Sequence, residues 1–228
     1  MENVQFVDNI SFLEPLPDEL KEKLSKMVLT KNVAKGDVLF QENDIAETIF
    51  FVNNGKIKIS KSSPGGKEIV LDIRKAGEIF PEVALFSKEE TTYSASASVV
   101  EFGSISMIRK ADLESILLQY PELFIFIFRT MAERLRLSQN TLQNVALYGK
   151  IGSLAFTLVR LCQDYGEVNE HGITIRLKLT HEDLGSFFGA TRESVTRMMN
   201  QLKNRGIVSK ENGYFTVHEL DSLKFYID

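Results

Sequence analysis

Between residues 31 and 109 the sequence consists of short apolar or alternating runs that are separated at regular intervals by turn signals. Runs of this length with a period of two are typical of β-strands, and the glycine, proline and asparagine residues between them are typical of tight turns. The runs lie at 38–40, 49–52, 57–60, 69–73 and 104–108, and the turn signals at 35–37, 53–55, 63–66 and 75–77. Many short strands at such spacing predict an antiparallel jelly-roll, a double-stranded β-helix.

A helical period replaces the strand pattern after residue 110. Residues 111–119 form one short predicted helix, and Pro121 suits the first turn of the next, because proline has no N–H to lose there. Along that second helix, which reaches to about residue 148, apolar residues recur at steps of four and three, a heptad spacing. The seam residues are Phe124, Phe128, Met131, Leu135, Ser138, Leu142 and Val145.

The heptad seam predicts that this helix pairs with a second copy of the chain in a parallel coiled coil. The alternative is a helix that lies on its own sheet. The charged residues beside the seam, Arg134 among them, are expected to be exposed, and this favours the dimer. Ser138 is the one polar residue of the seam, and it could fix the register or touch a ligand.

Two helices joined by a tight turn are predicted near the C-terminus. Thr180 is a good N-cap, and Asp183 supplies the acidic half of a capping box. Gly189 begins the turn, and Thr191 caps a second helix that runs to about Asn204. Its inward stripe, at helical spacing, consists of Val195, Met198, Met199 and Leu202.

The elements on either side complete a winged helix-turn-helix. A helix over 150–164, a polar loop over 165–172 and a strand over 173–177 precede the two helices. A small hairpin, 207–209 with 214–217, follows them. This arrangement presents the N-terminal end of the second helix to the major groove of DNA.

The predicted class is therefore α+β, with an N-terminal sheet domain over 1–110, a dimerisation helix over 111–148 and a DNA-binding domain over 149–228. A net charge of −4 argues against non-specific coating of nucleic acid, because proteins that do so are usually basic. Residues 1–12 lack a signal-peptide pattern, and no apolar run is long enough to span a bilayer. A lone cysteine, Cys162, suits a reducing compartment. A cytoplasmic protein with no membrane contact is expected.

Two stretches of this chain resemble the CRP/FNR family of bacterial transcription regulators. Residues 35–42, with 49–52 and 55–58, look like the start of its cyclic-nucleotide-binding-type β-roll. Residues 189–197 look like its recognition-helix signature. The resemblance covers nearly the whole length and implies a homodimer that binds double-stranded DNA, works with RNA polymerase and is switched by a signal in the β-roll.

Arg192, Glu193 and Arg197 match the three positions at which this family reads bases. Arginine can pair bidentately with guanine, and glutamate can accept from cytosine N4. Glu193 and Arg197 are four residues apart and can hold one another in place. The alternative is a solvated helix face. The candidates for phosphate contacts are Thr191, Ser194, Thr196 and Lys203, and Arg205 and Lys210 could touch flanking phosphates.

The expected effector pocket departs from the family's cyclic-nucleotide pattern. Glu82 is present, and Ser94 stands at the hydroxyl position. Pro81 replaces a glycine and has no N–H to give to a phosphate. The position of the phosphate-binding arginine is held by Thr92 or Tyr93, so the sequence disfavours cyclic AMP. The candidate pocket residues are Glu82, Val83, Tyr93, Ser94 and Ser138.

The sequence also bears on two other cofactors of the family, an iron–sulfur cluster and haem. An iron–sulfur cluster needs several cysteines, and the single one present excludes it. The histidines, His171, His181 and His218, all lie in the C-terminal domain. Haem would therefore need a methionine such as Met107 or Met131, or a tyrosine, and the sequence leaves it open. The effector stays unidentified, a small molecule or a redox or gas-type signal.

Catalytic and metal-binding patterns are not found in the sequence. It holds no Ser/His/Asp or Cys/His set, no metal-ligand spacing and no phosphate-cradling loop. We therefore expect no catalytic residues, no metal site and no enzymatic activity. A signal-binding module of a larger enzyme is a further alternative, but the winged helix argues against it.

Overall fold

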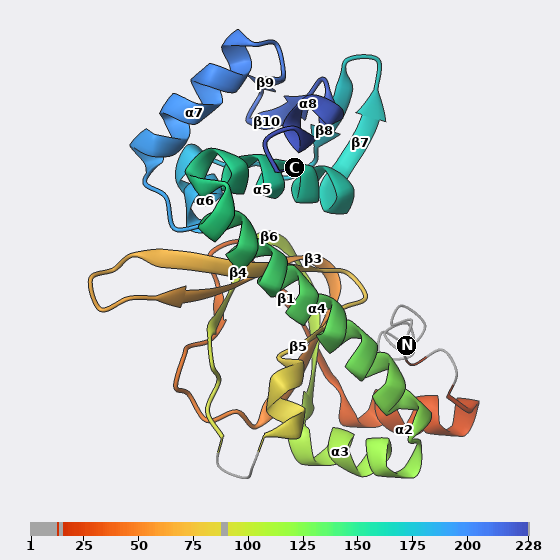
Figure 1. Ribbon diagram of the computed structural model, residues 1–228. Coiled ribbons are helices and arrows are strands. Elements are labelled where there is room, and N and C mark those ends of the chain that lie inside the picture. The colour runs from red at the N-terminus through yellow and green to blue at the C-terminus, as the bar shows by residue number, and fades with distance from the viewer. Residues whose placement is uncertain (1–12, 14–15, 88–90, 228) are drawn as a thin grey trace. The chain divides into compact units, whose positions relative to one another are not determined.

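The computed structural model describes residues 13, 16–87 and 91–227 of the chain (Figure 1). Residues 1–12, the basis for expecting no signal peptide, lie outside the described residues. Contacts divide the chain into two compact units. The first comprises Met1–Lys61 and Leu71–Arg134, and the second Ser62–Val70 and Leu135–Asp228. The domain boundaries expected at 110 and 148 stay predictions.

The first unit is built on an antiparallel sheet. Its strands are β1 (Leu29–Val33), β2 (Val38–Phe40), β3 (Thr48–Ser62), β4 (Glu68–Lys75), β5 (Ile79–Phe80) and β6 (Ser96–Arg109). The sheet order is β1-β6-β3-β4, with β2 paired to β6 and β5 paired to β3. The α+β class with an N-terminal sheet and a C-terminal helix-turn-helix is confirmed.

One predicted turn, at residues 53–55, is wrong because β3 continues through it. The register against β6 shifts between Val52 and Ile57, so the extra residues form bulges rather than a hairpin. Gly55 adopts a φ of 87°, which glycine reaches at little cost. A side chain on the facing Gly103 would place its Cβ 2.0 Å from the Asn54 carbonyl oxygen. Both glycines are therefore required by a close approach of two strands.

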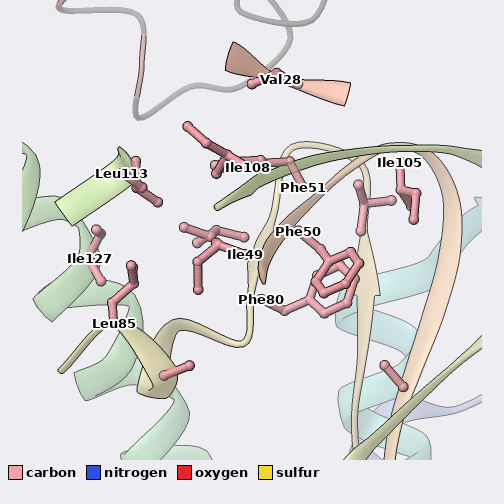
Figure 2. Close-up of a cluster of buried hydrophobic side chains, with 14 of the residues drawn as sticks. Val28, Ile49, Phe50, Phe51, Phe80, Leu85, Ile105, Ile108, Leu113 and Ile127 are labelled. Carbon is pink, nitrogen blue, oxygen red and sulfur yellow. The ribbon is translucent and has the colours of Figure 1, made fainter. Parts of the chain in front are cut away.

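The core of the first unit lies between the sheet and four helical segments. These are α2 (Asp18–Met27), the 3-10 helix η2 (Glu82–Phe86), α3 (Lys110–Gln119) and the start of α4 (Glu122–Leu147). In Figure 2 the rings of Phe50 and Phe80 lie face to face, and their centroids are 5.3 Å apart. Leu85 of η2 and Ile127 of α4 point toward the same cluster. The core thus fixes η2 and the first turns of α4 to the sheet.

The second unit contains the expected helix-turn-helix and wing. Its elements are α5 (Gly149–Tyr165), β7 (Gly166–Asn169), β8 (Gly172–Ile175), α6 (His181–Ser186), α7 (Arg192–Asn204), β9 (Val208–Glu211), β10 (Tyr214–Val217) and α8 (Leu220–Lys224). They form a four-stranded sheet in the order β7-β8-β10-β9. The polar loop predicted over 165–172 is wrong, because β7 pairs along β8. Every residue of β7 is exposed, so no apolar alternation marked it as a strand.

The helices of the second unit pack on this sheet and on one another, with α5 against β7 and β8, α7 against β9, α6 against α7 and α8 against α5. Their buried apolar residues include Leu154, Leu158, Leu161, Leu184, Val195, Leu202 and Leu223. None of the helices in the described ranges has the length and apolar character needed to cross a membrane.

Candidate DNA-binding surface and effector pocket

Both helices of the helix-turn-helix begin with a side-chain cap. The Thr180 hydroxyl accepts from the Asp183 N–H at 3.1 Å, and the Asp183 carboxylate accepts from the Thr180 N–H at 2.7 Å. The Thr191 hydroxyl accepts from the Ser194 N–H at 3.3 Å. Gly189, in the turn between them, has a φ of 71°, which disfavours any side chain there. The capping box expected from the sequence is confirmed, and the caps fix where α7 begins.

Burial of the inward stripe of α7 determines which side chains remain for DNA. The four predicted stripe residues, Val195, Met198, Met199 and Leu202, are all buried. Arg192, Glu193 and Arg197 lie on the same helix outside that stripe and are exposed. Three hydrogen-bonding side chains therefore project from the first two turns of α7.

The Glu193 carboxylate is held at the start of its own helix. Its pKa is lowered, because its own backbone N–H and then the Thr191 hydroxyl stabilise the charged form. Within the described residues, Glu193 forms no ion pair with Arg197, although their spacing allows one. The carboxylate therefore stays ionised at neutral pH, and Arg197 is left to interact with a partner outside the chain.

The candidate phosphate-contacting residues have different surroundings. The Thr196 hydroxyl donates to the Arg192 carbonyl oxygen at 2.8 Å and lies 2.8 Å from His181 Nδ1. Ser194 accepts from the Thr191 hydroxyl at 3.2 Å. Lys203 is exposed in the last turn of α7. The Thr196 hydroxyl is thus already engaged by the protein, whereas Lys203 is open to solvent.

Several cations lie over aromatic rings of the wing. Lys210 Nζ is 4.3 Å from the centroid of the Phe215 ring and donates to the Leu179 carbonyl oxygen at 2.8 Å. Arg176 and Lys178 both lie over the ring of Tyr214. Such rings hold a cation in place without neutralising it. Arg176 is also paired with Glu167, whereas Lys178 and Lys210 form no ion pair with another described residue and leave positive charge at the wing.

Within the second unit, the loop between β3 and β4 lies against the helix-turn-helix. Lys67 Nζ donates to the Gly189 carbonyl oxygen at 2.7 Å. A hollow of about 820 Å³ is lined on one side by Ser62, Gly66, Lys67 and Glu68, and on the other by residues of α6 and α7 that include Arg192 and Glu193. The N-terminal end of α7, which carries Arg192 and Glu193, therefore borders the same hollow as this loop.

A buried ionic network occupies the first unit beside η2. Glu82 is only 4% exposed, and its carboxylate forms an ion pair with Arg134 of α4. Arg74 of β4, 6% exposed, lies 3.6 Å from the same carboxylate through its Nη2 and also pairs with Asp72. Buried charges are costly unless they are paired, and here they are paired within the protein.

The two arginines of this network were not identified from the sequence. Arg134 was expected to be exposed, which is wrong, because its side chain is 16% exposed and also donates to the Ile79 carbonyl oxygen at 3.3 Å. Arg74 follows the apolar run 69–73, where a charged residue is typical of a strand end. The signal that could have revealed it is Glu82 itself, since a buried carboxylate requires a cation.

The remaining effector candidates differ in their surroundings. Tyr93 is buried, stacks on Phe40 with centroids 3.9 Å apart, and donates its hydroxyl to the Thr48 carbonyl oxygen at 2.9 Å. Burial raises the pKa of this phenol. Val83, Ser94 and Ser138 are exposed. Tyr93 therefore packs between β2 and β3, and its hydroxyl hydrogen is already donated to Thr48.

The seam residues of α4 divide into two groups. Phe124 and Met131 are partly buried against the core of the first unit. The exposed members are Phe128, Leu135, Leu142 and Val145. Phe86 of η2 stacks on Phe128 with centroids 5.2 Å apart and lies 6.0 Å from Phe124. The exposed seam side chains form an apolar face of α4 that the described residues of the single chain leave uncovered.

The described part of the chain contains no group of three or more His, Cys, Asp or Glu side chains placed to hold a metal ion. Cys162 is buried on α5, and burial raises its pKa to about 11. A thiol of this kind is poorly nucleophilic at neutral pH.

Two family profiles match this chain. One, described as a cyclic nucleotide-binding domain, matches residues 30–120, and the other, a Crp-like helix-turn-helix domain, matches residues 153–226. The "Anaerobic regulatory protein" of Bacillus subtilis is 35% identical over 214 residues, which cover 93% of this chain and 90% of that protein.

More distant relatives share the architecture. The "CRP-like cAMP-activated global transcriptional regulator" of Mycobacterium tuberculosis is 27% identical over 88% of each chain. The solved structure of a CooA mutant from Carboxydothermus hydrogenoformans matches with a TM-score of 0.74 at 22% identity, over 89% of each chain. At 22% identity this structural match supports the fold but not a shared function.

Proposed function

Since the chain belongs to the CRP/FNR family of DNA-binding transcription regulators, we propose that it acts as a homodimer that reads a pseudo-palindromic site. In this proposal Arg192, Glu193 and Arg197 read the bases, and the β-roll senses a signal that switches binding. The observation that carries the proposal is the exposure of these three side chains on the first two turns of the doubly capped helix-turn-helix.

The base-reading roles follow from the chemistry of the three side chains. Two guanidinium groups can pair with guanine O6 and N7, and the ionised Glu193 can accept from cytosine N4. Contacts with the phosphates of the DNA backbone would come from the hydroxyls of Thr191 and Ser194 and from Lys203. Thr196 contributes less to phosphate binding in this proposal, because its hydroxyl is engaged by Arg192 and His181.

Dimerisation is supported by the uncovered apolar face of α4. The members of this face, Phe128, Leu135, Leu142 and Val145, are exposed side chains on a helix of 26 residues. Water contact with so long an apolar stripe is unfavourable, and a second α4 would cover it by the same residues. A two-fold dimer would then read half-sites about one helical turn apart.

The ionic network around Glu82 supports a signal other than a cyclic nucleotide. A cyclic phosphate would have to compete with the Glu82 carboxylate for Arg74 and Arg134, and Pro81 offers it no N–H. We therefore propose a small-molecule or redox or gas-type signal. A cyclic-AMP-activated regulator is the alternative, favoured by the matching cyclic nucleotide-binding profile. A haem-based sensor would need a ligand other than histidine from the first unit, since all three histidines lie in the second.

The surroundings of the protein follow from this role. We propose that it works in the cytoplasm, meets RNA polymerase at promoters and catalyses no reaction. The family's regulators are not typically enzymes, and the described residues hold no metal-ligand cluster for such chemistry.

Selection of DNA by the full chain tests the proposal. The purified protein is mixed with a random-sequence duplex pool, and its mass in solution is measured by light scattering. We expect a dimer and a selected site with two-fold symmetry and half-site centres about 34–36 Å apart. A monomer, or a selected sequence with a single half-site, would contradict the dimeric reader. Absorption spectra of the same preparation report a bound haem or another coloured cofactor.

A further inference from the structure

His181 is the first residue of α6 and lies between the two helices of the reading unit and the wing. Its Nδ1 is 2.8 Å from the Thr196 Oγ1 on α7. Its ring stacks on Phe215 of β10, with the centroids 5.9 Å apart. The side chain therefore connects three elements, α6, α7 and the wing, at the end of α7 that carries Arg192.

The hydrogen bonds around Thr196 determine the tautomer of this histidine. Thr196 Oγ1 also lies 2.8 Å from the Arg192 carbonyl oxygen, which can only accept. The hydroxyl hydrogen therefore points to Arg192, and the bond to His181 must be donated by Nδ1–H. In a neutral imidazole the other nitrogen, Nε2, then carries a lone pair. Among the described residues Nε2 has no hydrogen-bond partner.

The charges that face the ring oppose its protonation in the free protein. Burial lowers the pKa of His181, and Lys210 of β9 and Arg192 of α7 lower it further. On its own helix, Asp183 is engaged with Thr180, and Glu182 is exposed. Phe215, the contact from β10, carries no charge. A DNA phosphate close to these cations would reverse the balance, because its negative charge favours the imidazolium.

We propose that His181 is a positioning residue of the DNA interface, which holds the first turns of α7 through Thr196 and takes up a proton when a phosphodiester group binds beside it. The proton enters at Nε2, which then has an N–H to donate to the phosphate, while Nδ1–H keeps its bond to Thr196. The inference rests on the proposed reading by Arg192, Glu193 and Arg197. The inference further predicts that the affinity of the protein for DNA increases as the pH falls.

The test measures the affinity of the full chain for its selected duplex and for a scrambled duplex. Fluorescence anisotropy is recorded between pH 5.5 and 8.5 at constant ionic strength. For the unsubstituted chain we expect log affinity to rise toward low pH, by up to about one unit per pH unit for each subunit. His171→Gln is the matched control, since His171 is an exposed histidine of the same unit, and it should keep this slope.

Substitutions at His181 separate the two roles. His181→Ala should lower discrimination between the two duplexes by about tenfold at pH 8, where the histidine is neutral. His181→Asn places an amide near the position of Nδ1, so it should recover most of that discrimination, but its pH profile should be flat. Thr196→Val should reproduce the loss of discrimination, and Thr196→Ser should restore it.

Each contrary result has a distinct meaning. A His181→Asn chain that keeps the full pH slope would overturn the proton uptake, and a folded His181→Ala chain with unchanged discrimination would overturn the positioning role. Thermal melts of each variant establish that it is folded. If His181→Ala unfolds, the pH profile of His181→Asn still tests the proton uptake, and the Thr196 variants still test the positioning role. Failure of the proposed function looks different, because the unsubstituted chain itself would then not distinguish the two duplexes.

Discussion

The carboxylate of Glu82, on η2, forms an ion pair with the guanidinium of Arg134, on α4. The pair joins the short helix beside the expected effector pocket to the helix expected to dimerise. Arg74 and Asp72 extend it into β4. A signal that moves η2 therefore acts on α4 through a charged contact as well as through apolar packing.

Removal of Arg134 should destabilise the first unit. Arg134→Met leaves the buried Glu82 with only the longer contact to Arg74, and we expect a loss of about 3 kcal/mol in the free energy of unfolding. Urea denaturation measures it. Arg136→Met, an exposed arginine two residues along the same helix, should change stability by less than about 0.5 kcal/mol. In a double-mutant cycle with Glu82→Gln, additive effects would contradict the coupling.

Arg197→Ala should remove discrimination at the base it reads and leave dimerisation intact. Loss of one bidentate base contact costs about 1–3 kcal/mol of specificity. Gel-shift competition between the selected duplex and single-base variants measures it. Lys203→Ala is the comparison, since loss of a phosphate contact should weaken binding to all sequences alike. An Arg197→Ala chain with its discrimination unchanged would refute the assignment.

A charge in the α4 face should prevent dimerisation. Leu135 is 61% exposed in the single chain, so Leu135→Glu costs little in folding but places a carboxylate in the coiled-coil seam. We expect a folded monomer by light scattering and a loss of DNA affinity. Leu118→Glu is the matched control, because Leu118 is 76% exposed on α3, away from the seam. A dimeric Leu135→Glu chain would place the interface elsewhere.

Cys162 should make stability fall at alkaline pH. Burial raises its pKa from 9.0 to about 11, so the folded state holds the thiol proton more tightly than the unfolded state. This stabilisation is complete below pH 9 and is lost between pH 9 and 11, at about 1.4 kcal/mol per pH unit. Urea denaturation of the unsubstituted chain and of Cys162→Ala at pH 8 and pH 10.5 isolates the effect. Equal alkaline losses in the two chains would show that other groups cause them.

Cyclic AMP should not stabilise the chain. A ligand present at a hundred times its dissociation constant adds about 2.7 kcal/mol to the free energy of unfolding. We expect no change in Tm at millimolar nucleotide, because Arg74 and Arg134 are already paired with Glu82. The cAMP-activated relative from Mycobacterium tuberculosis serves as the positive control. A rise in Tm of several degrees would reinstate cyclic AMP as the signal.

The sequence predicted best what depends on neighbours in the chain. The caps of α6 and α7 and the buried stripe of α7 follow from residues at most a few turns apart. The strands at 38–40 and 69–73 and the wing hairpin were likewise found.

Features set by distant partners were missed. The strand β7 depends on its pairing with β8. Arg74 of β4 can be buried because it pairs with Glu82, which lies on η2. The link from His181 to Thr196 crosses 15 residues and needs the fold to form. In the seam, periodicity could not separate Phe124 and Met131, which pack on the chain's own core, from Leu135 and Leu142, which are exposed.

In the proposed dimer, the aromatic stack of Phe86, Phe124 and Phe128 would make the amount of protein in the cell part of the regulation. Phe128 is half exposed in the single chain and belongs both to this stack and to the face that a second α4 would cover. If the chain dimerises through this face, a signal that shifts Phe86 would change the dimerisation constant, and by reciprocity dimerisation would change the affinity for the signal by the same factor. A promoter that alters expression of this chain would therefore alter its sensitivity as well as its abundance.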